Sequence, residues 1–287
     1  MKDTTWTVKG GRVLGPAPFF IVGIVNVTPD SVYDGGAHAK AGAGVAHGLE
    51  LARQGAHILD VGGESTRPYA DTVSVEEELE RVVPVIAGLL ASDELSGRDG
   101  VPAPVISVDT YKAEVAAAAL DAGAVILNDV SAFSFDSGLA DVIAQYKPGY
   151  VLMHSAGRPG TMQDTPRYVD VVDEIMAFFE CKLEELDKLG LPRNRVVLDP
   201  GIGFGKTLEH NLDILRGIER FKAFGLPLYM GLSNKSLWHG LLGLAVDERQ
   251  NATQAATAIM AGKGVPIHRV HEVELARQTL TIVNEIA

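Results

Sequence analysis

Four polar residues that lie far apart along this chain have side chains suited to recognising the edge of a flat heterocycle. They are Asp109, Asn128, Asp199 and Lys235, and each follows a short apolar run. The two carboxylates and the amide can accept hydrogen bonds from amino and ring N–H groups, and the lysine can donate to a carbonyl or ring nitrogen. A single residue of this kind often only satisfies buried polar groups between strands, but four at neighbouring strand ends indicate a binding site.

Two basic side chains near the C-terminus form a candidate anion site. Arg269 and His271 are two residues apart at the end of an apolar run, so on a strand their side chains point the same way. This arrangement suits a pyrophosphate, with the arginine as a bidentate donor and the histidine as a donor or proton source. The alternative is a surface salt bridge to the final helix.

The segment 233–236, Ser-Asn-Lys-Ser, has the pattern of a helix start. Ser233 is the expected N-cap, and the free N–H groups that follow a cap attract carboxylates and phosphates. An ordinary cap is the alternative. Lys235 favours a ligand, because a cation in the first turn opposes the helix dipole and needs another reason to be there.

The glycine-rich segment 199–207 does not fit a nucleotide-binding loop. A Walker loop requires glycine five residues before Gly205, where Pro200 stands, and the third glycine of a dinucleotide fingerprint falls on Lys206. A flexible loop after a strand explains the glycines, but it does not explain Asp199.

Metal-binding motifs are weak in this sequence. The eight histidines include no His-Glu-x-x-His pattern, and the single cysteine excludes a thiolate cluster. Mg²⁺ held mainly by substrate phosphates needs as little as one protein ligand, for which Asn26 is the candidate. We expect Cys181 to be buried in an amphipathic helix, and Trp6 and Trp238 to be packing residues.

Eight short apolar runs alternate with helical stretches and supply the strands that would position these residues. Each run lacks polar alternation, as strands covered on both faces do. The predicted strands are Phe19–Val25, His57–Val61, Val105–Val108, Val125–Leu127, Tyr150–Met153, Val196–Leu198, Leu228–Leu232 and Val265–Val270. The predicted helices include Gly44–Gln54, Val75–Leu90, Ala113–Ala122, Val169–Leu189 and Asn211–Phe224. Eight such units predict an α/β fold, a closed (β/α)8 TIM barrel. An open doubly wound sheet is the alternative, but its glycine-rich dinucleotide turn is not found.

Polar residues follow all eight predicted strands, where the active sites of such barrels lie. In strand order they are Asn26, 62–67, Asp109, Asn128-Asp129, His154, Asp199, 233–235 and 269–271. Their convergence on one mouth of the barrel predicts a functional site there.

Residues 1–18 lie outside the repeat. Trp6–Val8 and Arg12–Leu14 flank Gly10-Gly11, which predicts a small hairpin that caps the bottom of the barrel. We therefore expect a hairpin extension over 1–18 and one barrel domain over 19–287. Ser96–Gly100 is a polar insertion between the second helix and the third strand.

Composition limits the partners and the compartment. With 287 residues, 46% of them hydrophobic, the chain can bury a large core, and its net charge of −12 argues against nucleic acid as a partner. A local cluster of basic groups can still bind a small anion. The single cysteine, the polar N-terminus and the lack of a long apolar run predict a cytoplasmic protein without a membrane span.

Taken together, these motifs resemble the dihydropteroate synthases, a family of pterin-binding TIM-barrel enzymes. The matching segments are Asn26–Ser31, Asp34–Gly36, Gly63–Pro68, Ser107–Thr110, Asn128-Asp129, Met153-His154, Asp199–Lys206, Ser233–Ser236 and Arg269–His271. The resemblance covers residues 19 to 287, and the combination of motifs is specific. It implies a transferase of folate biosynthesis, a target of sulfonamides, that joins 6-hydroxymethyl-7,8-dihydropterin pyrophosphate to p-aminobenzoate.

The resemblance also implies roles for individual residues. The pterin would be held by Asp109, Asn128, Met153, Asp199 and Lys235. The pyrophosphate would be held by Asn26, Thr66, Arg67, Arg269 and His271, with Asn26 also binding Mg²⁺. The p-aminobenzoate would contact Val32, Pro68, Phe204 and Ser236. Lys235, Asp109, Arg269 and His271 would act in catalysis, the first two loops would close over the site, and the enzyme would be a homodimer.

Two positions depart from the family pattern, and both border the p-aminobenzoate side. Val32 stands where the family usually has phenylalanine, and Asn234 stands where it usually has arginine. Two alternatives remain open. One is a pterin-binding methyl-transfer module, which would have no use for the second-loop motif or the Arg269 and His271 pair. The other is a non-catalytic relative that retains only pterin binding.

Overall fold

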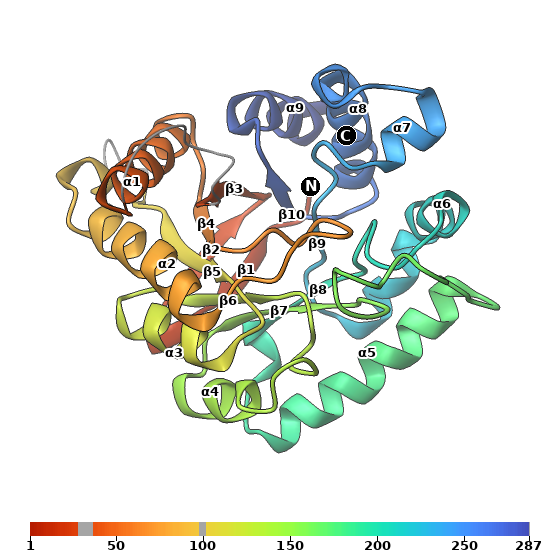
Figure 1. Ribbon diagram of the computed structural model, residues 1–287. Coiled ribbons are helices and arrows are strands. Elements are labelled where there is room, and N and C mark those ends of the chain that lie inside the picture. Colours follow the sequence, from red (N-terminus) through yellow and green to blue (C-terminus); the bar gives the residue numbers. More distant parts are fainter. Residues whose placement is uncertain (28–36, 98–101, 287) are drawn as a thin grey trace.

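The fold is a cylinder of eight parallel strands surrounded by helices (Figure 1). The computed structural model describes residues 1–27, 37–97 and 102–286. The strand order around the sheet is β8-β7-β6-β5-β4-β3-β10-β9. A parallel bridge between Leu198, in β8, and Leu228, next to β9, joins the two ends of this order. The predicted (β/α)8 barrel is therefore confirmed.

The elements of the barrel alternate along the chain as the sequence predicts. The strands are β3 (Phe20–Asn26), β4 (Ile58–Gly62), β5 (Val105–Asp109), β6 (Ile126–Asp129), β7 (Gly149–Met153), β8 (Val196–Asp199), β9 (Tyr229–Met230) and β10 (Ile267–Val270). The helices are α1 (Ala37–Arg53), α2 (Val75–Leu90), α3 (Ala113–Asp121), α4 (Leu139–Tyr146), α5 (Val171–Lys188), α6 (Leu208–Arg216), α7 (Leu237–Leu242), α8 (Gln250–Gly262) and α9 (Val273–Ile286).

The strands are apolar throughout because both of their faces are covered. Every residue of β4, β5, β6, β7 and β8 is buried, by other barrel residues on the inside and by helices on the outside. Helix α2 illustrates the outer layer: Val82, Val85 and Leu89 are buried, and Ser74 Oγ accepts a hydrogen bond from Glu77 N at the helix start. Its predicted bounds are confirmed, since the cap and the apolar stripe agree.

The N-terminal strands β1 (Thr4–Thr7) and β2 (Val13–Ala17) form an antiparallel hairpin that closes one end of the barrel. Trp6 and Val8 pack in one cluster with the first residues of the barrel strands, including Val105 and Ile126. Trp6 also donates from Nε1 to the carbonyl of Arg195 at 2.7 Å. The predicted cap at the bottom of the barrel is confirmed, and it leaves the carboxyl ends of the strands for the site.

Two predictions outside the site are wrong. The helix expected over Asn211–Phe224 consists of α6, which begins early because Thr207 caps it, and a 3-10 segment, Ile218–Phe224, that follows Gly217. Cys181 lies on the exposed face of α5. The buried apolar stripe of that helix runs instead through Phe179 and the residues one helical turn before and after it. The polar insertion lies partly outside the described residues. Within the described ranges, no helix is long and apolar enough to cross a membrane.

Candidate active site

Strand register places four of the predicted pterin-binding residues at or next to the carboxyl ends of adjacent strands. Gly62 pairs with Asp109, and Asp109 pairs in turn with Asn128 on the next strand. Met153 pairs with Asp199 across β7 and β8. Asn128 pairs in turn with Val151, so Met153 and Asp199 lie two residues further along the parallel strands than Asp109 and Asn128 do. The prediction that these residues end adjacent strands at one mouth is confirmed, and the charges of Asp109 and Asp199 both act on the pKa of Lys235.

Arg269 connects this group to a buried carboxylate that sequence analysis missed. Its Nε donates to Asp60 Oδ2 at 2.7 Å and its Nη2 donates to Asp109 Oδ2 at 2.6 Å. Asn128 donates from Nδ2 to the same Oδ2 of Asp60 at 2.9 Å. The signal for Asp60 was present in the sequence, because a carboxylate in the middle of a buried apolar run needs a partner. The alternative of a surface salt bridge for Arg269 is wrong.

Burial and pairing oppose each other in this network. Burial raises the pKa of Asp109 to about 7, although the guanidinium of Arg269 acts against the shift. Burial alone would lower the pKa of Arg269, but the carboxylates of Asp60 and Asp109 outweigh it, and the net shift is upward. Arg269 therefore keeps its charge at every physiological pH, while Asp109 can exchange a proton near neutrality.

Asp199 and Lys235 are two further charged groups of the site, and the charge of each acts on the pKa of the other. Asp199 Oδ1 accepts a hydrogen bond from Gly201 N at 2.8 Å, and burial raises the pKa of Asp199 to about 6. Burial lowers the pKa of Lys235 to about 8, and the charge of Asp199 opposes that shift. The ammonium of Lys235 also lies 4.4 Å from the ring centroid of Phe204, a cation–π contact. Lys235 thus stands between a carboxylate and an aromatic wall.

The glycine-rich segment after β8 is held in shape by a buried lysine. Lys206 Nζ donates to the carbonyls of Gly201 and Phe204 at 2.9 and 3.0 Å, and lies 2.9 Å from His154 Nδ1. A side chain at Gly201, where φ is +69°, would collide with the carbonyl of His154. The segment is thus held by buried hydrogen bonds and presents Asp199 and Phe204.

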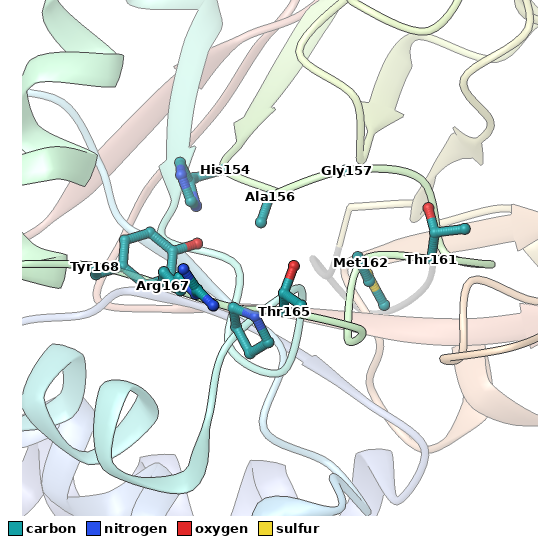
Figure 2. A pocket seen from close by; sticks show the side chains of 9 residues that line it. His154, Ala156, Gly157, Thr161, Met162, Thr165, Arg167 and Tyr168 are labelled. Atoms are coloured by element: carbon teal, nitrogen blue, oxygen red, sulfur yellow. The ribbon is translucent and has the colours of Figure 1, made fainter.

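His154 belongs to this support and not to the charged network. It is 8% exposed, and burial, aided by the neighbouring Lys206 charge, lowers its pKa to about 2. It lines a pocket of about 310 Å³ over the segment between β7 and α5, which Figure 2 shows. Thr161, Arg167 and Tyr168 line the same pocket. None of the predicted substrate-binding residues is among the described residues that line it.

His271 is paired with Ser233, which is not the N-cap that the sequence predicts. Ser233 Oγ accepts from His271 N at 3.3 Å and lies 2.9 Å from His271 Nδ1. The hydroxyl has two lone pairs and one proton, so it can accept from Nδ1–H or donate to Nδ1, according to the tautomer of the imidazole. Burial and the charge of Arg269 lower the pKa of His271 to about 4. At neutral pH His271 is therefore neutral and carries one ring N–H.

The helix start near Lys235 is displaced by three residues from its predicted position. Helix α7 begins at Leu237 with Ser236 as its N-cap, and the Ser236 side chain makes no capping hydrogen bond. Asn234 has a positive φ of 56°, which asparagine tolerates better than most residues. Arg249 holds this turn by donating to the carbonyl of Asn234 at 2.9 Å.

The second loop begins from a rigid base. Glu64 is buried and accepts hydrogen bonds from Lys112 Nζ at 2.6 Å, from Val73 N at 3.1 Å and from the hydroxyl of Tyr111. Beyond it Thr66 is half-buried, whereas Arg67 and Pro68 are exposed. Asn26 ends β3 opposite Gly62, and Val32, in the first loop, lies outside the described residues.

An apolar wall adjoins the polar residues. Met153 and Phe204 are buried in one cluster with Tyr111, Val130 and Met162. This cluster combines a predicted pterin contact, Met153, with a predicted p-aminobenzoate contact, Phe204. A flat ring bound at this mouth would have apolar side chains on one side and hydrogen-bonding groups along its edge.

The donors present suit a magnesium ion held mainly by a substrate. In the described part of the chain, no group of three or more His, Cys, Asp or Glu side chains could hold a metal ion. Asn26 offers one amide oxygen at the exposed end of β3. Mg²⁺ commonly takes one or two protein ligands and completes its shell with phosphate oxygens and water, so Asn26 fits such an ion.

Comparisons with known proteins agree with this geometry. Residues 22–271 match a family model described as pterin binding enzyme. The chain is 40% identical over 263 residues to the dihydropteroate synthase of Escherichia coli K12, covering 92% of this chain and 90% of that protein. It is 37% identical over 281 residues to that of Streptococcus pyogenes, covering 97% and 100%.

Solved structures show the same similarity. The Yersinia pestis dihydropteroate synthase in complex with a sulfonamide drug superposes with a TM-score of 0.88 at 36% identity, over 98% of each chain. The Xanthomonas albilineans dihydropteroate synthase with 4-aminobenzoic acid gives a TM-score of 0.87 at 39% identity, again over 98% of each chain.

Proposed function

This chain belongs to the dihydropteroate synthase family of pterin-binding enzymes, and from that premise we propose that it condenses 6-hydroxymethyl-7,8-dihydropterin pyrophosphate with p-aminobenzoate. The products are 7,8-dihydropteroate and pyrophosphate. The observation that carries the proposal is the buried network in which Arg269 joins Asp60, Asp109 and, through Asp60, Asn128. It unites an anion-binding group with acceptors for a heterocycle.

The pterin ring is recognised through hydrogen bonds along its polar edge. Asp109, Asn128 and Asp199 offer acceptors to the amino and ring N–H groups of the pterin. Lys235 donates to its carbonyl and ring nitrogen. Met153 contacts the ring face. A carboxylate and a lysine in a buried site discriminate strongly against ring systems that leave these groups unpaired.

The reaction breaks the bond between the pterin methylene carbon and the pyrophosphate oxygen. The aryl amine nitrogen of p-aminobenzoate forms a bond to that carbon and loses a proton, and pyrophosphate leaves with the bonding electrons. Arg269 donates to the leaving oxygens as their charge grows, and His271 does the same in the tautomer that carries its proton on Nε2. Asp109 stabilises the positive charge that develops on the pterin methylene.

The pyrophosphate is positioned by Arg269 and His271 together with Asn26, Thr66 and Arg67 from the first two loops. Mg²⁺ bound with Asn26 as a protein ligand would supply further charge for the phosphate oxygens. The ring of p-aminobenzoate lies between Phe204 and Pro68. Its carboxylate is held by Ser236, and Val32 borders it. A cytoplasmic location and a homodimeric assembly complete the proposal.

The affinity for dihydropterin should depend on pH with a maximum between about 7 and about 8. The acceptors Asp199 and Asp109 must be ionised, and burial raises their pKa values to about 6 and about 7, so affinity falls as pH decreases through this range. Lys235 must be protonated to donate, and its pKa is lowered to about 8, so affinity also falls above that pH. Calorimetric titration from pH 5 to 9 measures this profile. An affinity that is flat over the range would contradict these assignments.

Replacing Asn234 with arginine should lower the KM for p-aminobenzoate by roughly 2- to 30-fold, from a cation–π or charge contact worth about 0.5–2 kcal/mol. The positive φ at this position adds a stability cost on the order of 1 kcal/mol for a side chain other than asparagine or glycine. Steady-state kinetics and thermal melting check both parts. Asn234→Gln is the matched control, because it shares the backbone cost without the charge. If both variants change the KM for p-aminobenzoate equally, the charge of the arginine does not cause the effect.

Incubation of the protein with both substrates and Mg²⁺, followed by mass detection of 7,8-dihydropteroate, tests the proposed reaction. We expect product only when both substrates are present. A pterin-binding methyl-transfer module would give no product from these substrates. Absence of dihydropteroate at saturating concentrations would overturn the proposal.

A further inference from the structure

Asp60 joins a residue proposed to bind the pterin to one proposed to bind the pyrophosphate. The side chain is completely buried in the middle of β4. Its Oδ2 accepts from Arg269 Nε at 2.7 Å and from Asn128 Nδ2 at 2.9 Å. Its Oδ1 is buried and makes no hydrogen bond within the described structure. A carboxylate with one buried unpaired oxygen is costly for the fold, so stability alone does not explain why Asp60 is there.

The chemistry of these contacts determines how the Asn128 amide is turned. A guanidinium can only donate hydrogen bonds, so Asp60 Oδ2 acts as an acceptor. The Asn128 atom next to that oxygen must therefore be the donor Nδ2, and an amide flipped the other way would place two acceptors together. The remaining atom, Asn128 Oδ1, is then fixed as an acceptor and makes no hydrogen bond to a described residue.

We propose that Asp60 is a specificity-determining positioning residue that fixes Asn128 as a hydrogen-bond acceptor toward the heterocycle. An acceptor at this place selects a ring that carries an amino or N–H group there over a ring that carries a carbonyl. The inference rests on the proposed function, since it requires Asn128 to contact the pterin. Asp60 acts through Asn128 and through its hold on Arg269, without a bond to substrate of its own.

Replacing Asp60 with asparagine keeps the size of the side chain and removes this control. The new amide can present either an oxygen or an NH₂ group to Asn128, so the Asn128 amide can turn over and offer its own NH₂ group to a ligand carbonyl. A variant that only loosened the barrel would weaken all ligands alike. Loss of discrimination between ligands is therefore the signature that separates positioning from a structural role.

The test compares two ligands that differ at one group. Pterin carries an amino group where lumazine carries a carbonyl, and calorimetry gives the dissociation constant of each. We expect the wild type to prefer pterin, and we expect Asp60→Asn to reduce that preference at least tenfold. Asp129→Asn is the matched control: Asp129 is equally buried on β6 but accepts from Ser131, Phe133 and Tyr150, away from Asn128. That variant should melt at a lower temperature and keep the wild-type preference.

The outcomes separate the inference from the function on which it rests. If Asp60→Asn binds both ligands more weakly by the same factor, Asp60 is structural and the inference is wrong, while the proposed function stands. If the wild type binds no pterin, the proposed function itself fails. Should Asp60→Asn not fold, Asp60→Ser carries the same comparison, because a hydroxyl can also donate or accept and leaves space for water.

Discussion

Arg269→Ala should lower turnover by roughly 100- to 1,000-fold, the usual effect of removing one preorganised donor from a developing negative charge. The charge that Arg269 meets is largest in the transition state, because the pyrophosphate gains charge as its bond to the methylene carbon breaks. The arginine is held for this role by Asp60 and Asp109 at 2.7 and 2.6 Å. Measured kcat with both substrates saturating checks the prediction.

The same substitution leaves two buried carboxylates without their cation, so a loss of stability is expected as well. Two measurements separate this effect from catalysis. Binding of dihydropterin without pyrophosphate should weaken far less than turnover does. Arg269→Lys keeps the charge but loses the two-pronged geometry, and it should recover part of the melting temperature and little of the turnover. If binding of plain dihydropterin drops as far as kcat, Arg269 is a structural residue.

Asp199→Asn should weaken binding of the pterin pyrophosphate by about 1–3 kcal/mol, or roughly 5- to 150-fold, because a buried donor on the ligand loses its charged acceptor. The variant keeps the shape of the side chain, and its amide oxygen can still accept from Gly201 N, which Asp199 Oδ1 does at 2.8 Å. The loop that carries Phe204 should therefore stay in place. Calorimetry gives the dissociation constant.

Inorganic pyrophosphate provides the control for this variant, since Asp199 is assigned to the pterin and not to the anion. Its dissociation constant should be the same in Asp199→Asn and in the wild type. An unchanged affinity for pterin pyrophosphate would remove Asp199 from the site. A loss of affinity for both ligands would indicate a collapse of the loop instead.

Local patterns in the sequence predicted the barrel well. The bounds of α2 were predicted correctly because its cap, Ser74, directly precedes its apolar stripe in the sequence. The convergence of Asp109, Asn128 and Asp199 also followed from strand ends alone, since parallel strands of similar length share a mouth. Such features depend on neighbours in the chain, which the sequence displays directly.

Contacts between distant residues could not be predicted in this way. Asp60 and Arg269 are 209 residues apart, and only the closure of the barrel places them in contact. Ser233 was expected to cap a helix, but its hydroxyl pairs with His271, which is 38 residues away and directly follows β10. The role of Lys206 was missed for the same reason, because His154, its buried partner, follows a different strand, β7. The sequence alone does not show whether a serine caps a helix or whether a lysine is buried, because both depend on partners that are distant in the chain.

Release of pyrophosphate that depends on p-aminobenzoate tests the central claim most directly. The protein, Mg²⁺ and the pterin pyrophosphate are mixed, p-aminobenzoate is then added to saturation, and pyrophosphate is followed by a coupled assay. We predict little release before the addition, and afterwards one pyrophosphate for each p-aminobenzoate consumed. If the protein binds the pterin pyrophosphate but releases no pyrophosphate after the addition, it is a non-catalytic pterin-binding relative, and the claim that it is a dihydropteroate synthase is contradicted.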